Sequence, residues 1–208
     1  MISTAEASAP ALGSALGVVV GAAAIAPFVH VGQLSAHMAL HIATMNVAAP
    51  LVAILTNRVL PDATSPSRTL WTATAIQLAI LWLWHLPTAH HLAASSLFGN
   101  AAAQISLFAA ALFFWDALLR LRPPEQWQGI IALLVTGKLA CLLAGLLVFS
   151  TRPIFHPHGT DRALDDQHLA GLLMIVACPA SYVLAGVIMA IRFVGILKKK
   201  PIPDLSTN

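Results

Sequence analysis

Long apolar runs, separated by short polar segments, follow one another along the whole chain. Six runs approach or exceed the length of a membrane span, at 9–28, 31–56, 70–86, 101–119, 127–150 and 167–191. Because no backbone group can stay unpaired in hydrocarbon, such runs predict helices. A transmembrane β-barrel would instead show short strands of alternating polarity. We therefore expect an all-α fold, a polytopic transmembrane bundle of about six helices.

Composition supports a membrane protein. Apolar residues make up 58% of the 208 residues and charged residues only 9%, whereas soluble domains carry about 25% charged residues. This balance argues against a soluble globule, a disordered chain and a nucleic-acid-binding protein, which needs a clustered basic face. Both cysteines lie in apolar runs and suggest no disulfide framework. We expect residues 1–208 to form one transmembrane domain.

Basic residues fix the expected orientation. If both termini are cytoplasmic, the outer loops carry only Arg152 and Arg162, and Lys138 lies inside a span. The inner segments then carry the other eight, namely Arg58, Arg68, Arg120, Arg122, Arg192, Lys198, Lys199 and Lys200. The positive-inside rule favours this arrangement. Residues 198–208 would be a basic cytoplasmic tail.

Histidines are the main chemical anomaly, because all nine fall on the outer side of this topology. His37 and His41 share one stripe of the 31–56 span with His30, about 10 and 16 Å below its outer end. Two imidazoles four residues apart can bind one ion. The alternative is two packing histidines, each bonded to a neighbouring backbone or hydroxyl group. Intramembrane histidines usually face the bundle interior, so we favour ligands.

Further candidate ligands lie at the same expected depth. His85 ends the 70–86 span before Pro87, and His168 opens the last span. Met174 and Cys178 share one face of that span and would suit Cu(I), although both residue types also fill apolar cores, which is the favoured interpretation for each. Asp166 could cap a helix or orient a ligating imidazole. The remaining outer histidines are expected to be exposed loop residues: His90, His91, His156 and His158.

Lys138 lies in the middle of the 127–150 span. An intramembrane cation is a functional candidate by default, but we slightly favour a structural pair with Asp116 or a backbone carbonyl. The chain contains no phosphate-binding glycine loop, nucleophile elbow or His-Glu-x-x-His helix. It therefore offers ligands without evident acid–base machinery, and we expect no enzymatic activity.

Three segments together resemble the polytopic CtaG-type (caa3 class) assembly factors of bacterial cytochrome c oxidase. They are His37-Met38-Ala39-Leu40-His41 with Ala49-Pro50-Leu51, then Trp84-His85-Leu86-Pro87, and finally 166–174, Asp-Gln-His-Leu-Ala-Gly-Leu-Leu-Met. The resemblance implies a multi-pass protein of the bacterial inner (plasma) membrane that matures a heme–copper oxidase. It suggests copper handling around His37, His41 and His85, with Asp166 and Met174 nearby. Members often carry a histidine where this chain has Gln104.

These observations combine into one hypothesis and two rivals. The hypothesis is a periplasmic copper site, with candidate metal residues His37, His41, His85, Met174, Asp166 and His168, that delivers copper to an oxidase subunit or another assembly factor within the lipid bilayer. The first rival is a b-type cytochrome, in which two imidazoles from facing helices hold heme b. The second is a structural scaffold subunit of an oxidase complex, which needs none of the central histidines.

Overall fold

In the computed structural model, residues 32–59, 64–155 and 161–199 are described. Their elements, in chain order, are α2 (Gln33–Ala43), the π-helical segment η2 (Thr44–Ala48), α3 (Ala49–Val59), α4 (Ser67–Trp84), α5 (Pro87–Ser95), α6 (Leu97–Leu119), the 3-10 turn η3 (Pro123–Glu125), α7 (Gln126–Phe149) and α8 (Asp161–Lys199). Within these residues the only β pairing is an isolated bridge between Ser65 and Leu121. The predicted all-α bundle is confirmed.

Four helical stretches of the described residues are long and apolar enough to cross a membrane: Gln33–Val59, Leu97–Leu119, Pro123–Phe149 and Asp161–Gly195. A fifth candidate is α4 with α5, which meet at 74°. The stretches match five predicted spans. The predicted first span, 9–28, lies outside the described residues, as do His30, His156, His158 and residues 200–208 of the predicted tail.

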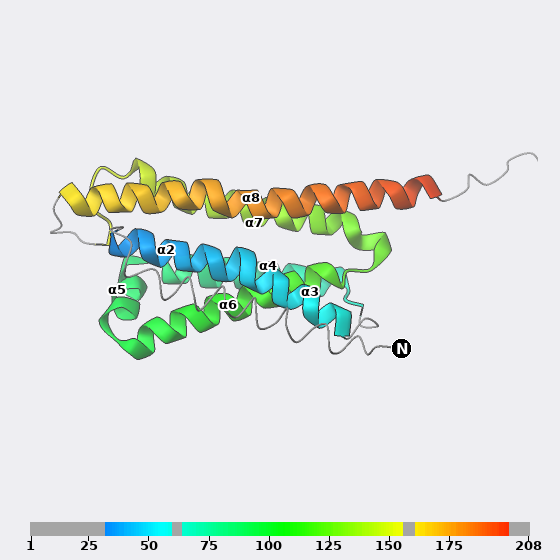
Figure 1. Ribbon diagram of the computed structural model, residues 1–208, viewed down its shortest axis with the longest axis horizontal. Coiled ribbons are helices and arrows are strands. Elements are labelled where there is room, and N and C mark those ends of the chain that lie inside the picture. The colour runs from blue at the N-terminus through cyan, green and yellow to red at the C-terminus, as the bar shows by residue number, and fades with distance from the viewer. Residues whose placement is uncertain (1–31, 60–63, 156–160, 200–208) are drawn as a thin grey trace, which may run out of the picture.

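Two expectations about helix boundaries are wrong. The loop expected after His85 is helix α5, which begins with Pro87 at its first position, where a missing N–H costs nothing. The last helix begins at Asp161 rather than near Gln167 and runs for 39 residues through Pro179. Its length of about 58 Å far exceeds the hydrocarbon core, and its last turns extend past the other helices (Figure 1).

The bundle is held by close approach of small residues. Helices α7 and α8 pack along each other, α2 packs on α8, and α6 contacts both α3 and α4 (Figure 1). A Cβ atom at Gly171 would lie 3.0 Å from the Ala144 carbonyl oxygen and 2.7 Å from Val148. Only glycine therefore permits this spacing of α7 and α8. Such close packing matters in lipid, because the hydrophobic effect does not drive helices together there.

The two ends of the bundle differ in composition. The start of α2, the end of α4, α5 and the start of α8 meet at one end (Figure 1), which we call the histidine end because it carries His37, His41, His85, His90, His91 and His168. The other, which we call the arginine end, carries Arg58, Arg68, Arg120, Arg122 and Arg192. The segregation expected from sequence holds for the described residues, while the cytoplasmic placement of the termini stays a prediction.

A π-helical segment divides the first described span. Pro50 has no N–H, so a carbonyl of the preceding turn loses its helical partner. The indole Nε1 of Trp115 on α6 donates to the Met45 carbonyl over 3.1 Å, and Thr44 Oγ1 donates back to Leu40 and His41. Single π turns are frequent at functional sites, and this one begins three residues after His41.

Candidate functional site

Four imidazoles from three helices converge at the histidine end. The ring centroids of His37 and His41 on α2 are 4.2 Å apart, and that of His85, at the end of α4, lies 5.8 Å from His41. His90 on α5 lies 5.4 Å from His37. His41 and His85 are only 4% and 6% exposed. We call these four residues the histidine cluster.

Asp166 fixes the start of α2. Its carboxylate accepts the backbone N–H groups of Leu34 (2.9 Å) and Ser35 (3.1 Å) and the Ser35 hydroxyl. A Cβ atom at Gly32 would overlap this carboxylate, so glycine lets α8 approach the helix start closely. Asp166 therefore caps a different helix from its own and contacts no imidazole through these bonds. It positions the turn that carries His37.

The unprotonated ring nitrogen of His85 faces the sulfur atom of Met38. Its Nδ1 lies 2.7 Å from the Leu81 carbonyl oxygen, which can only accept, so Nδ1 carries the proton. The other nitrogen, Nε2, is then unprotonated and lies 3.3 Å from Met38 Sδ, which has no proton to donate. Two electron-pair donors thus face each other inside the protein, at 6% and 1% exposure.

His41 and Gln104 add unpaired polar atoms beside this pair. Within the described residues, the buried Nδ1 of His41 and both side-chain polar atoms of Gln104 have no partner in hydrogen-bonding geometry, although Gln104 lies close enough to His41 for a side-chain hydrogen bond. A buried polar atom without a partner costs about 1–3 kcal/mol. Such atoms are available to a bound group. Gln104 therefore borders the cluster.

A small cavity adjoins these donors. It measures about 20 Å³ and is lined by His41, His85, Met174, Cys178 and Tyr182, among others. That volume holds about one water-sized particle. Met174, from α8, is 3% exposed and lines the same cavity as His41 and His85.

A groove connects the cluster to the surface. It measures about 320 Å³, lies between α2 and α5, and includes both His37 and His90 in its lining. His90 is half-buried, and its ring centroid lies 4.3 Å from that of Phe155. The expectation that His90 is an exposed loop residue is wrong, because Pro87 starts a helix that turns its ring inward. His91, the next residue, is exposed.

The structure does not bring two of the six candidate metal residues into the cluster. The Nε2 atom of His168 lies 3.1 Å from the Ser150 carbonyl, between the ends of α7 and α8, and Asp166 is engaged by α2. Among the described residues, no group of three or more His, Cys, Asp or Glu side chains lies at metal-holding distances. Any ion bound here would need thioether ligands or a side-chain rearrangement.

Sequence reasoning missed Met38 and undervalued His90. Met38 is one residue beyond His37 and thus about 100° off the histidine stripe, so helical periodicity gives no signal for it. Only the tertiary arrangement, in which α2 packs chiefly on α8, brings its sulfur to His85 at the end of α4. The available signal for His90 was Pro87, a residue favoured at the first position of a helix.

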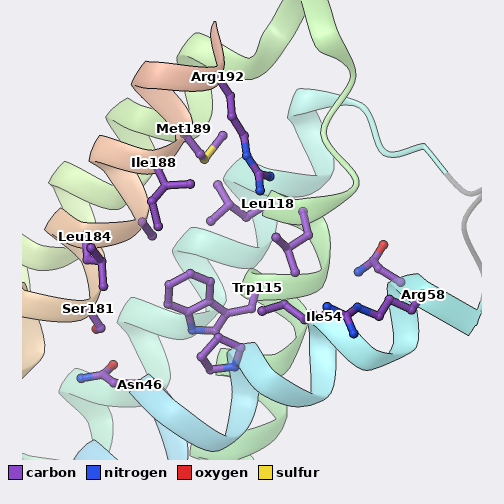
Figure 2. A pocket seen from close by; sticks show the side chains of 14 residues that line it. Asn46, Ile54, Arg58, Trp115, Leu118, Ser181, Leu184, Ile188, Met189 and Arg192 are labelled. Carbon is purple, nitrogen blue, oxygen red and sulfur yellow. The ribbon is translucent and has the colours of Figure 1, made fainter. Parts of the chain in front are cut away.

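A larger cavity lies elsewhere, near the arginine end. It measures about 630 Å³ between α3, α6 and α8. Figure 2 shows Trp115, Leu118, Leu184 and Ile188 among its mostly apolar lining, with Arg58 and Arg192 at its edge. Asn46, in the π segment, borders both this cavity and the small one beside the histidines. Among the described residues, its lining contains no cluster of metal-ligating side chains. The larger cavity is therefore not the one that holds the candidate ligands.

Comparison with known proteins gives one clear match. A family model described as the cytochrome c oxidase caa3 assembly factor matches residues 3–195. Searches of curated proteins and of solved structures find no match. The family model covers every described element except the last turn of α8, including the whole histidine cluster.

Proposed function

Because the chain belongs to the cytochrome c oxidase caa3 assembly factor family, we propose that it binds Cu(I) in the histidine cluster and hands it to a partner during oxidase assembly. The recipient is an oxidase subunit or another assembly factor in the bacterial inner membrane. The cluster faces the periplasm in the orientation that the basic residues favour. Binding and release of the ion require no covalent reaction, so the protein acts as a copper carrier.

One observation carries the proposal, namely the pair of His85 Nε2 and Met38 Sδ. Metal–nitrogen bonds of about 2.0 Å and metal–sulfur bonds of about 2.3 Å place both donors on one ion at this spacing. Their separation of 3.3 Å corresponds to an angle near 100° at the ion. Imidazole and thioether together suit Cu(I), and in a site without carboxylates a monovalent ion leaves one uncompensated positive charge where a divalent ion would leave two.

Neighbouring residues can complete the ligand set. His41 Nδ1 is unpaired, and the ring of His41 lies 5.8 Å from that of His85. Met174 lines the same cavity from α8. Copper would enter along the groove that His37 and His90 line, since those imidazoles lie between the surface and the buried donors.

Heme b fits this site less well than an ion. Ligand pockets for molecules of drug size measure about 300–1,000 Å³, whereas the cavity between His41 and His85 measures about 20 Å³. Two imidazoles that hold a heme lie on opposite faces of the porphyrin, and the small cavity that His41 and His85 line has no room for that ring system. The scaffold alternative is what remains if the protein binds no copper.

The test is a Cu(I) titration of the purified full-length protein against a chromophoric chelator. We expect about one Cu(I) per chain, and Met38→Leu, which keeps the volume and removes the sulfur donor, should weaken binding by about tenfold or more. X-ray absorption should show sulfur in the wild-type copper shell and less in this variant. His91→Ala and His168→Ala are matched controls and should bind normally. Normal binding by a Met38→Leu, His85→Ala double variant would overturn the proposal.

A further inference from the structure

Lys138 lies in the middle of α7 on the outside of the bundle. It is 12 residues after Gln126 and 11 before Phe149, or about 18 and 16 Å from the two helix ends. Its side chain is exposed. The same face of α7 carries exposed apolar residues at helical spacing, namely Ile131, Leu134, Leu142 and Leu146, which are 39–54% exposed. We call this stripe the Lys138 face.

The expected pairing of Lys138 with Asp116 is wrong. Asp116 accepts from Arg120 over 2.7 Å and from Asn57 over 3.3 Å near the arginine end. None of the eight acidic residues in the sequence lies in the middle of an observed or expected span. The chain therefore supplies no carboxylate at the depth of Lys138, and among the described residues no hydrogen bond or ion pair to its ammonium group is found.

Snorkelling does not resolve this exposure. A lysine side chain extends about 6 Å, which is much less than the distance from Lys138 to either end of α7. Intramembrane charges almost always face a bundle interior or a water-filled cavity and are paired there. An ammonium group on an apolar outer face is costly in lipid, so its position indicates a surface that another polar group covers.

We propose that the Lys138 face docks a transmembrane helix of another protein that carries a carboxylate at mid-membrane depth. The partner's Asp or Glu pairs with Lys138, and its apolar residues pack along Ile131, Leu134, Leu142 and Leu146. A second copy of this chain does not fit, because it has no mid-span carboxylate to offer and a symmetric contact would bring two ammonium groups together. The predicted span 9–28 likewise contains no acid. This docking surface goes beyond the copper proposal and does not depend on it.

The test uses photo-crosslinking of the full-length protein in its native membrane. A benzophenone amino acid replaces Leu134 or Leu142, and the crosslinked peptide is identified by mass spectrometry. We expect both positions to give the same protein adduct, on a transmembrane helix with an Asp or Glu near its midpoint. Val176 of α8, which is 71% exposed, is the control position and should not give this adduct.

Charge variants complete the test. Lys138→Leu suits lipid better than the wild-type residue, so folding is preserved, and it should lower the adduct yield at least about tenfold. Lys138→Arg should retain the adduct, and Lys138→Glu should regain it when the partner's acid is changed to Lys. Both Leu and Arg variants should bind Cu(I) as the wild type does. Adducts with lipid, residues 9–28 or a second copy alone, or an unchanged yield in Lys138→Leu, would overturn the proposal.

Discussion

The small cavity beside the histidines and the larger, more open cavity near the arginine end lie on either side of the π-helical segment and differ in almost every property. The one at the histidine end measures about 20 Å³ and is lined by nitrogen and sulfur donors as well as apolar atoms. The one near the arginine end measures about 630 Å³ and is mostly apolar, with two arginines at its edge. Asn46 borders both. The larger cavity therefore has a mostly apolar lining, whereas the smaller one has the candidate metal ligands.

Packing explains this difference. At the histidine end, Asp166 anchors α2 to α8 through three hydrogen bonds to Leu34 and Ser35, and the side chains between the helices leave room for little more than an ion. Beyond the π segment α3 continues along α6, and a cavity opens between α3 and α8. The candidate site is therefore identified by donor atoms that lie close together and not by the volume of the cavity.

The largest expected effect is the removal of two imidazoles. His41→Ala with His85→Ala takes away both buried nitrogen donors, so Cu(I) affinity should fall by at least about 100-fold. Chelator competition measures this. Replacing Arg58 and Arg192 with Gln, at the edge of the large cavity, should leave the affinity unchanged. Copper loss in the arginine variant with retention in the histidine variant would reverse the assignment of the two cavities.

The next largest effect is expected from a substitution that overpacks the helix interface toward the histidine end. Ala170 of α8 is fully buried, so Ala170→Leu should lower the free energy of unfolding by about 1–3 kcal/mol. Thermal unfolding in detergent, followed by circular dichroism, measures the change. The matched variant is Ala185→Leu on the same helix, which lines the large cavity and should shift stability by less than about 1 kcal/mol. Equal losses in both variants would contradict the difference in packing.

A loss of similar or smaller size is expected from Asp166→Ala. Removing an N-terminal cap costs about 0.5–2 kcal/mol, and here the cap joins two helices. Because α2 carries His37 and His41, Cu(I) affinity should fall as well, by less than in the double histidine variant. Asp165→Ala is the control, since its side chain is exposed. Unfolding and copper titrations on the same samples separate the two effects, and wild-type values in both would show that the cap is dispensable.

The smallest effect is expected at the border between the cavities. Trp115→Phe removes the hydrogen bond to the Met45 carbonyl and leaves a smaller aromatic ring against Tyr182, whose ring is nearly parallel to the indole at 5.7 Å. We expect a loss of about 1 kcal/mol with little change in copper affinity. Hydrogen exchange at Thr44–Ala48 should increase in this variant. Unchanged exchange there would mean that the π segment does not depend on Trp115.

Prediction from sequence succeeded where a physical rule acts along one helix. Apolar length predicted the spans, and helical spacing placed His37 and His41 one turn apart on one stripe, now seen at 4.2 Å. Prediction failed where the local structure depends on contacts with other segments. The short helix α5, the role of Asp166 as a cap for α2, and the location of His168 beside Ser150 all depend on contacts between segments far apart in the sequence.

The sequence by itself determined that this protein is a membrane helix bundle with histidines gathered toward one end, because hydrocarbon forces every span into a helix and helical periodicity orders its faces. Only the tertiary structure decided which donors meet. Met38 and His85 are 47 residues apart on different helices, and their contact follows from how the helices of the bundle pack together, with α2 against α8. The tertiary structure also places Lys138 on the outer face of α7, because the packing of neighbouring helices decides which face of a helix is buried.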